Sequence, residues 1–218
     1  MLLTVISLAF LIVPCAPQTG NIGVVTGISP PKQCVSSNVA PQQPVVRLAL
    51  YHSVNHLRRQ FALGEDVFPQ ILHLKGPRLM YAVRYSCDLE KKAFLALITS
   101  KRPDGYASLM YDSEPGEKRN LTSYLLEAAT QWKGEHSLGP SVLMYAYVLF
   151  MGCAYNYKAE GELARFHLLC LFDKRAVDVP KTETLTPPCK QNSDCKWFSD
   201  STCQDSLCWG PQESYNIQ

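Results

Sequence analysis

Two histidines stand one helical turn apart and are the first candidates for metal chemistry. His52 and His56 occupy positions i and i+4 of a segment with helical periodicity, so both imidazoles lie on one face. Neutral imidazole is a common zinc ligand, but a zinc site needs three or four ligands. The segment has no His-Glu-x-x-His pattern and no third ligand close by in the sequence. The pair is therefore interpreted as two solvated or hydrogen-bonded histidines.

Glu117 and Glu135 are the carboxylate pair that could do acid–base work on sugars. Such pairs are common on protein surfaces, so the pair is only a weak indication of an enzyme. The chain also lacks a Gly-x-Ser-x-Gly nucleophile motif and a Gly-rich phosphate loop. We therefore predict a protein that is not an enzyme, needs no cofactor and acts by binding.

The N-terminus indicates the secretory pathway. The first charged side chain is Lys32, and residues 1–16 are an apolar run too short to span a bilayer. This run is interpreted as a signal peptide. No later uncharged apolar run reaches about 18 residues, the length of a membrane helix. We expect the mature chain to be extracellular, without a membrane span.

Cysteine usage supports an oxidising compartment. Setting aside Cys15 in the signal peptide leaves eight of the nine cysteines, an even set that predicts four disulfides and no thiol free for catalysis. A zinc ribbon is disfavoured because paired Cys-x-x-Cys units are missing. The eight are Cys34, Cys87, Cys153, Cys170, Cys189, Cys195, Cys203 and Cys208.

Helical periodicity marks three segments that would position these groups. Residues 45–63 carry apolar side chains at helical spacing, ending at Gly64, and Ser86 can cap a helix that runs to about Ile98. A third helix begins at Thr122 or Ser123 and ends near Gly134. Its inward residues are expected to be Leu125, Leu126 and Ala129.

The later part of the main domain predicts a buried helix and a hairpin. Residues 141–149 are continuously apolar, and residues 151–157 and 164–172 read as two strands joined by a polar link. Cys153 and Cys170 lie in these strands, where the cross-strand spacing permits a disulfide. Helices packed around a small sheet predict an α+β fold.

Composition divides the chain into five parts. The signal peptide, 1–16, is followed by an N-terminal arm, 17–44, and a main domain, 45–175. A linker, 176–188, leads to a cysteine-rich C-terminal module, 189–218. Four cysteines within twenty positions staple that module, and we expect the main core to lie upstream of it.

Six segments, in order, resemble the CAP superfamily of cysteine-rich secretory, antigen 5 and pathogenesis-related proteins. The first is Asn55-x-Leu57-Arg58, followed by Ala62 and Gly64, and it is similar to the family's first helix. The tail resembles the cysteine-rich end of nematode activation-associated secreted, or venom-allergen-like, proteins. The other segments are 80–90, 116–120, 132–135, 145–154 and 169–172.

The resemblance implies a three-layer α-β-α sandwich with a small disulfide-rich C-terminal extension. It also implies the pair Cys153–Cys170. Cys34 should then join Cys87, which leaves three pairings for the tail, of which we favour Cys189–Cys203 with Cys195–Cys208.

The family's metal site is expected to be degenerate. Its two histidines and two glutamates correspond by position to Val54, Glu117, Glu135 and Gly139, so both histidine places are lost. Two carboxylates alone are a poor zinc site, and we predict that no zinc is held there.

Charge and surface residues define the expected partners. The net charge of +2 favours neither nucleic acid nor an anionic membrane, and the pair Arg58–Arg59 is interpreted as a solvated helix face. Asn120 begins an Asn-Leu-Thr glycosylation sequon. The resemblance implies an extracellular, even host, protein partner; the alternative is an extracellular lipid carrier for a fatty acid or sterol. Candidate binding aromatics in the tail are Trp197, Phe198 and Trp209.

Overall fold

The computed structural model describes residue 34 and residues 43–67, 77–133, 139–173 and 186–211. The expected signal peptide, most of the N-terminal arm and most of the linker lie outside these residues. Among the described residues, no helix has the length and apolarity needed to cross a membrane.

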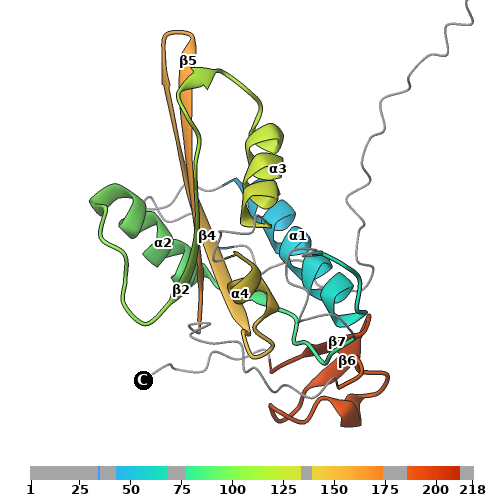
Figure 1. The fold of residues 1–218 in the computed structure, drawn as a ribbon. Helices are drawn as coiled ribbons and strands as arrows, with labels where there is room; N and C mark the ends of the chain where they lie inside the picture. The colour runs from blue at the N-terminus through green and yellow to red at the C-terminus, as the bar shows by residue number, and fades with distance from the viewer. Residues whose placement is uncertain (1–33, 35–42, 68–76, 134–138, 174–185, 212–218) are drawn as a thin grey trace, which may run out of the picture.

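The described chain forms a central sheet between two helical layers, with a small two-stranded sheet at one end (Figure 1). The strand order is β1-β4-β5-β2, with β3 paired to β5, and β6 pairs with β7 in the tail. The predicted α+β sandwich with a disulfide-rich extension is confirmed. The elements are α1 Pro44–Ala62, β1 Arg84–Tyr85, α2 Cys87–Thr99, β2 Ala107–Asp112, β3 Gly116–Glu117, α3 Leu121–Trp132, α4 Gly139–Met144, β4 Phe150–Glu160, β5 Leu163–Phe172, a 3₁₀ turn Asn192–Asp194, β6 Thr202–Gln204 and β7 Leu207–Trp209.

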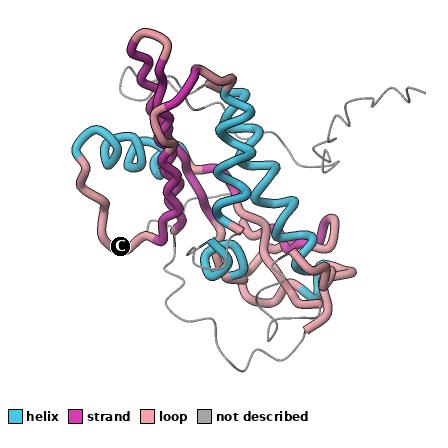
Figure 2. The backbone as a smooth tube through the Cα atoms, turned by 45° about the horizontal axis from the view of Figure 1, so that its top comes forward, coloured by secondary structure: helices cyan, strands magenta, loops and turns pink. Residues whose placement is uncertain are grey.

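Alternate residues of β5 supply the cores on the two faces of the sheet. Phe166 and Leu168 pack with α1, α3 and α4, whereas Leu169 and Leu171 pack with α2. This period of two follows from the pleat, because successive side chains point to opposite faces. Figure 2 shows α2 on one side of the strands and the other helices on the opposite side.

The β4–β5 hairpin is the centre of the sheet. Its register places Cys153 opposite Cys170, and Gly161 turns the chain with a φ of 59°, a conformation that costs glycine little. Both strands were expected, but each extends beyond its predicted range, while β2 was not foreseen. The polar residues 158–162 had been read as a link; most of them continue the ladder.

The α2 helix lies against β4 at a glycine. Ser86 caps α2 as expected, because its hydroxyl accepts the Leu89 N–H. A Cβ placed on Gly152 would lie 2.3 Å from the Glu90 nitrogen and 2.6 Å from the Leu89 carbonyl carbon. The absence of a side chain at Gly152 therefore sets how closely the helix approaches the sheet.

Three buried polar side chains of α1, those of Arg47, Asn55 and Arg58, fasten this helix to the rest of the domain. One of them, Arg58, contradicts a prediction from the sequence. Arg58 is 1 % exposed, so its assignment to a solvated face was wrong. Its guanidinium donates to the carbonyl oxygens of Tyr81, Leu143, Tyr145 and Ala146 at 2.7–3.3 Å. Burial lowers the pKa of Arg58 to about 9, still high enough for it to carry its charge at neutral pH.

The side chain of Asn55 behaves like one more peptide unit. Its amide donates to the Val83 carbonyl at 2.9 Å, and its oxygen accepts the Val83 N–H at 2.8 Å. Because both bonds are buried, they satisfy backbone groups that water cannot reach. Together with Arg58, this side chain fixes α1 to the segment that precedes β1.

The third and fourth helices differ in detail from prediction. α3 begins at Leu121 with Asn120 as its N-cap, and its buried residues are Tyr124, Ala128 and Trp132 rather than the expected Leu125, Leu126 and Ala129. Both sets have helical spacing, and the aromatic side chains bury the larger surface. α4 ends at Met144, earlier than expected, because Tyr145–Val148 forms a turn.

Four disulfides join Cys34 to Cys87, Cys153 to Cys170, Cys189 to Cys203 and Cys195 to Cys208. These are the four pairs expected from the sequence. The last two lie wholly within the tail, which makes them local staples of a segment too short for its own large core.

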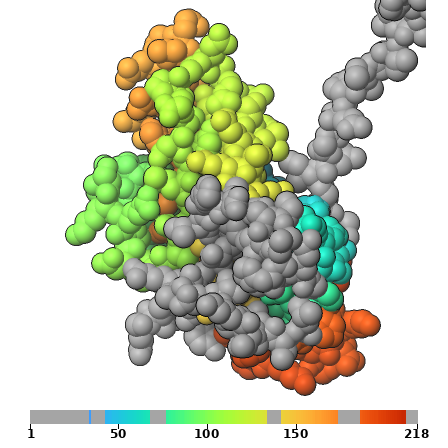
Figure 3. All heavy atoms as spheres, viewed as in Figure 1, coloured from blue at the N-terminus to red at the C-terminus, as the bar shows by residue number. Residues whose placement is uncertain are grey.

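The tail is part of the main core rather than an appendage. Cys208 and Tyr81 form a parallel bridge, and the Cys208 N–H donates to the Met80 carbonyl at 2.9 Å. Leu207 and Trp209 join the same core cluster as α1 and α4. Most of the core lies upstream of the tail, as expected, and Leu207 and Trp209 complete it. In the space-filling view the tail occupies the end of the molecule opposite the β4–β5 tip (Figure 3).

Replacing Gly152 with alanine should destabilise the protein. The added methyl group meets backbone atoms of α2, which cannot move without shifting the helix, so we expect a loss of about 1–3 kcal/mol, as for overpacked cores. Chemical denaturation measures this loss. Gly116→Ala is the matched control, since a Cβ added at Gly116 would have its nearest neighbour, the Glu114 carbonyl oxygen, 3.9 Å away. Equal stability of the two variants would contradict the close approach.

Candidate functional site

The candidate site is an apolar groove between α1 and α3 with a volume of about 220 Å³. Eleven of its thirteen lining residues are apolar, and Ser53 and Thr122 supply the two polar side chains. No lining residue carries a charge. The lining residues are Val45, Val46, Ala49, Leu50, Ser53, Val54 and Leu57 of α1, and Leu121, Thr122, Leu125, Leu126, Ala129 and Trp132 of α3.

The second apolar stripe of α3 makes the groove. Leu125, Leu126 and Ala129 were predicted to face the core; all three line this space, and of them Leu125 also packs against the core. The helix is held by its other stripe and by Trp132, whose indole N–H donates to the Met110 carbonyl at 3.0 Å. At the rim, Val45 and Leu126 are 66 % and 59 % exposed. An amphipathic helix with two apolar stripes therefore buries one and leaves the other facing α1.

The four positions expected to correspond to the family's metal site are distributed as follows. Val54 is 2 % exposed and lines the groove. Glu117 is exposed on β3, paired with Leu163 next to the hairpin turn, and Gly139 begins α4. Glu135 lies outside the described residues. The side chain of Val54 offers no donor atom and its surroundings are apolar, so this position does not fit a metal centre.

Histidines likewise form no ligand cluster among the described residues. The one described group of three potential ligands is Cys189, Cys195 and Cys208, whose sulfurs are all in disulfides. His52 is half-buried with its ring against Tyr51, and its Nδ1 has no hydrogen-bond partner among the described atoms. This nitrogen is thus neither solvated nor hydrogen-bonded among the described atoms, which differs from the interpretation of His52 drawn from the sequence.

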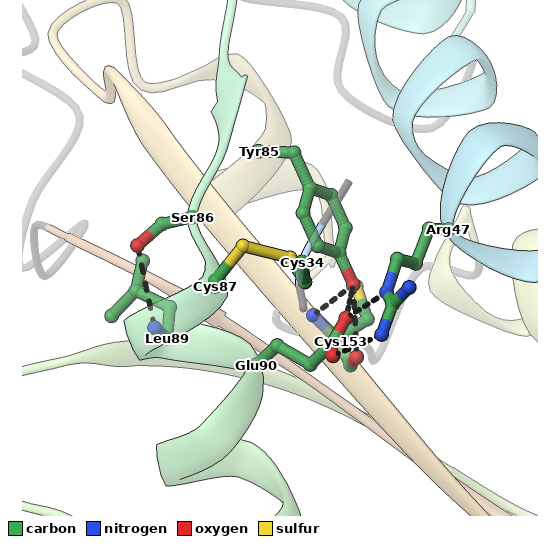
Figure 4. The surroundings of a disulfide bond; sticks show 8 residues. All are labelled: Cys34, Arg47, Tyr85, Ser86, Cys87, Leu89, Glu90 and Cys153. Carbon is green, nitrogen blue, oxygen red and sulfur yellow. Dashed lines mark hydrogen bonds and ion pairs between the residues drawn. A yellow bond between two sulfur atoms is a disulfide. The ribbon is translucent and has the colours of Figure 1, made fainter. Parts of the chain in front are cut away.

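A buried ion pair holds the first turn of α1, beside the groove, to the first turn of α2 (Figure 4). Arg47 donates from Nε and Nη2 to the two carboxylate oxygens of Glu90 at 2.6 and 2.7 Å. The Tyr85 hydroxyl donates to Glu90 at 2.7 Å and accepts the Cys153 N–H at 3.3 Å. The hydrogen bond to Glu90 raises the pKa of Arg47, and burial raises the pKa of the Tyr85 hydroxyl.

This network has almost no signal in the sequence. Arg47 and Glu90 are 43 positions apart, and neither has a distinguishing neighbour in the sequence. The only available signal was Arg47 on an otherwise apolar stripe, the same kind of signal that Arg58 gave. A charged residue at a core position of a helix indicates a buried partner.

The three candidate aromatics of the tail have different surroundings. Trp209 is buried, with the Arg84 guanidinium over its ring, and Phe198 packs edge-on against Tyr81. Trp197 is 59 % exposed, its backbone N–H donates to the Tyr81 hydroxyl at 2.9 Å, and its ring meets Tyr147 edge-on. Of the three, Trp197 is the side chain presented to solvent.

Trp197 also lines an open cleft of about 790 Å³ between the tail and Leu79. Two lysines, Lys190 and Lys196, lie along it together with Asp194. The Asp194 carboxylate accepts the N–H groups of Lys190 and Gln191, which lowers its pKa. The cleft thus combines a fixed aromatic surface with polar and cationic groups.

Comparison with known proteins supplies the fold family. No family model and no curated protein matches the sequence. Solved structures do match. The manganese-bound form of Ac-ASP-7, an Ancylostoma-secreted protein, is 22 % identical with a TM-score of 0.62 over 81 % of this chain and 91 % of its own.

Two further nematode structures agree. Na-ASP-1 gives a TM-score of 0.65 at 19 % identity over 82 % of this chain and 48 % of its own, and BmVAL-1 gives 0.62 at 16 % over 79 % and 97 %. This chain has the CAP fold. At these identities the likeness establishes the architecture and leaves function to the residues of this chain.

Within this CAP domain the pair Arg47–Glu90 should be essential for stability. Glu90→Gln removes the charge that compensates a buried guanidinium, and we expect a loss of about 3–5 kcal/mol. The control is Asp88→Asn in the same helical turn, exposed and expected to cost less than about 1 kcal/mol. Thermal or chemical unfolding of both variants tests this, and a mild effect of Glu90→Gln would show that Arg47 is solvated.

Proposed function

We propose that this chain is a secreted, non-enzymatic CAP-fold protein that binds the acyl chain of a lipid in the α1–α3 groove. The observation that supports this most directly is the composition of the groove: eleven apolar side chains, two hydroxyls and no charge. Ligand sites in proteins are concave and mostly apolar with a few polar groups that orient the ligand. This groove has both features.

A fatty acid suits the groove better than a bulky ring system. Each methylene transferred from water into an apolar site contributes about 0.8 kcal/mol, so a linear chain gains affinity over its whole length. The groove has a volume of only about 220 Å³ and runs between two helices, which favours a slender ligand. Without a lining charge, the carboxylate head would remain at the rim, where water and the hydroxyls of Ser53 and Thr122 are within reach.

The same residues support the proposal that this chain does not use the metal chemistry of its structural relatives. Ac-ASP-7 was solved with manganese and NaASP2 with zinc. Here Val54 takes the place expected for one histidine and forms part of an apolar wall. Val54 therefore serves ligand packing rather than metal binding.

Filling the groove should abolish lipid binding. Ala49→Phe places a ring between α1 and α3, and we expect at least a tenfold loss of affinity for a fluorescent fatty acid, or about 1.4 kcal/mol. Leu48→Phe is the matched control, since Leu48 is a neighbouring exposed residue outside the groove. Titration by fluorescence measures both variants, and a fluorescent sterol serves as the alternative ligand.

Material secreted by cells provides a second measurement. Solvent extraction followed by mass spectrometry should recover fatty acid from the wild type and less from Ala49→Phe, and elemental analysis should find no stoichiometric zinc or manganese. Recovery of sterol alone would change the ligand class. Equal fatty acid affinity in Ala49→Phe, Leu48→Phe and the wild type would contradict a site in the groove.

A second function, binding of an extracellular protein, is favoured by Trp197. Tryptophan is enriched among the residues that dominate interface energies, and a side chain that is already fixed loses little entropy on binding. Tyr81 and Tyr147 hold Trp197 in place, and the adjacent cleft offers lysines at its border. We infer that the tail cleft is the contact surface for such a partner.

Trp197→Ala should therefore weaken partner binding while leaving stability almost unchanged. The ring is mostly exposed, and its removal leaves the backbone bond to Tyr81 in place. The partner is first captured with the mature secreted protein, and its affinity is then measured for each variant. Tyr157→Ala, which removes a partly exposed aromatic from the β4–β5 hairpin, is the control. Equal binding by Trp197→Ala and Tyr157→Ala would locate the contact elsewhere.

A further inference from the structure

We propose that an N-linked glycan on Asn120 screens the mouth of the α1–α3 groove and limits the entry of its ligand. The inference rests on the groove proposed above as the lipid site, and it adds a covalent device that controls access. Three observations carry it: the position of the sequon, the hydrogen bonding of the Asn120 side chain, and the exposed apolar residues of the groove's rim.

The last two residues of the sequon line the groove. Asn120 is exposed and directly precedes Leu121 and Thr122, both of which line the groove. N-linked glycans are bulky, solubilising groups carried on protein surfaces. A glycan at this position begins one residue from the lining itself, so its first sugars lie over one end of the groove.

The Asn120 side chain can carry a glycan and still cap α3. Its Oδ1 accepts the Ser123 N–H at 2.8 Å and the Ser123 hydroxyl at 3.0 Å. The glycan is attached through Nδ2, which leaves Oδ1 unchanged as an acceptor. The helix start therefore survives modification, and the cap fixes the direction in which the first sugar leaves the protein.

The groove's rim has the exposed apolar surface that such a glycan would cover. Val45 on α1 and Leu126 on α3 are both lining residues and both mostly exposed. Contiguous apolar surface on a secreted protein invites association unless something shields it. A hydrophilic oligosaccharide over this rim provides that shield and slows the entry of an apolar ligand.

Enzymatic deglycosylation provides a clean test, because a peptide-N-glycosidase hydrolyses the glycosylated asparagine to aspartate. Aspartate is as good an N-cap as asparagine, so α3 keeps its start while the sugar is removed. The protein is secreted from eukaryotic cells and its intact mass is measured before and after treatment. Asn120→Asp is the genetic equivalent, and Lys118→Ala is the control that keeps the sequon, because Lys118 is exposed and lies outside the groove.

Two readouts follow. The first is the association rate of a fluorescent fatty acid, which should rise several-fold when the glycan is removed and stay unchanged in Lys118→Ala. The second is the fluorescence of an apolar dye that binds the exposed apolar residues of the groove's rim. This fluorescence should also rise when the glycan is removed, and it does not depend on fatty acid binding.

The outcomes separate the two proposals. An intact mass without a glycan, or equal rates and dye signals in both forms, would overturn screening while leaving the groove's ligand untouched. Failure of both forms to bind fatty acid would overturn the proposed function. In that case the dye signal alone decides whether the glycan covers the rim.

Discussion

The buried guanidinium of Arg58 is the interaction on which the rest of the domain depends. A charge removed from water is costly unless hydrogen bonds replace those of the solvent, and here four carbonyl oxygens from two separate regions of the chain do so. Those carbonyls come from the segment before β1, from the last turn of α4 and from the turn that follows it, so one side chain on α1 fixes the position of both regions. Because these regions hold Tyr81 and Tyr147, the same contact also sets the support of Trp197 in the tail.

The groove depends on a balance between the two apolar stripes of α3. Tyr124, Ala128 and Trp132 anchor the helix on the sheet, and the orientation that results directs Leu125 and Ala129 toward α1. A polar residue on this second stripe would make an ordinary amphipathic helix and a wet surface. Leu125 is partly buried against the core and Leu126 is mostly exposed, so this stripe is incompletely covered, and an apolar ligand in the groove would cover it.

Much of the fold could be predicted from local sequence, and the parts that could not share a physical cause. The Ser86 cap and the hairpin of residues 151–172 carry their signal in short segments, and the structure has the same features. The four cysteine pairs followed instead from the even count and the resemblance to the CAP superfamily. β2 is six residues long and follows the turn residues Pro103, Asp104 and Gly105, so its signal was present in the sequence and was missed. The burial of Arg58 depends on residues distant in the sequence, and so does the burial of Leu207 and Trp209. In the tail, the partners are more than a hundred positions away, and tertiary burial outweighs the local pattern. For the site, that Val54 stands at a histidine place of the CAP family stays a prediction from the resemblance, whereas the groove required the orientation of α3.

The position of the tail has a consequence for proteolysis. Both tail disulfides close within residues 189–208, and neither of the other two reaches the tail. A single cut between β5 and Cys189 would therefore produce a two-chain molecule whose smaller fragment has no covalent tie to the larger. That fragment would be held by the bridge to Tyr81, by the bond from Arg84 to the Gly210 carbonyl at 2.6 Å, and by the packing of Leu207 and Trp209. A non-reducing gel with detergent would release it, while a native gel would not.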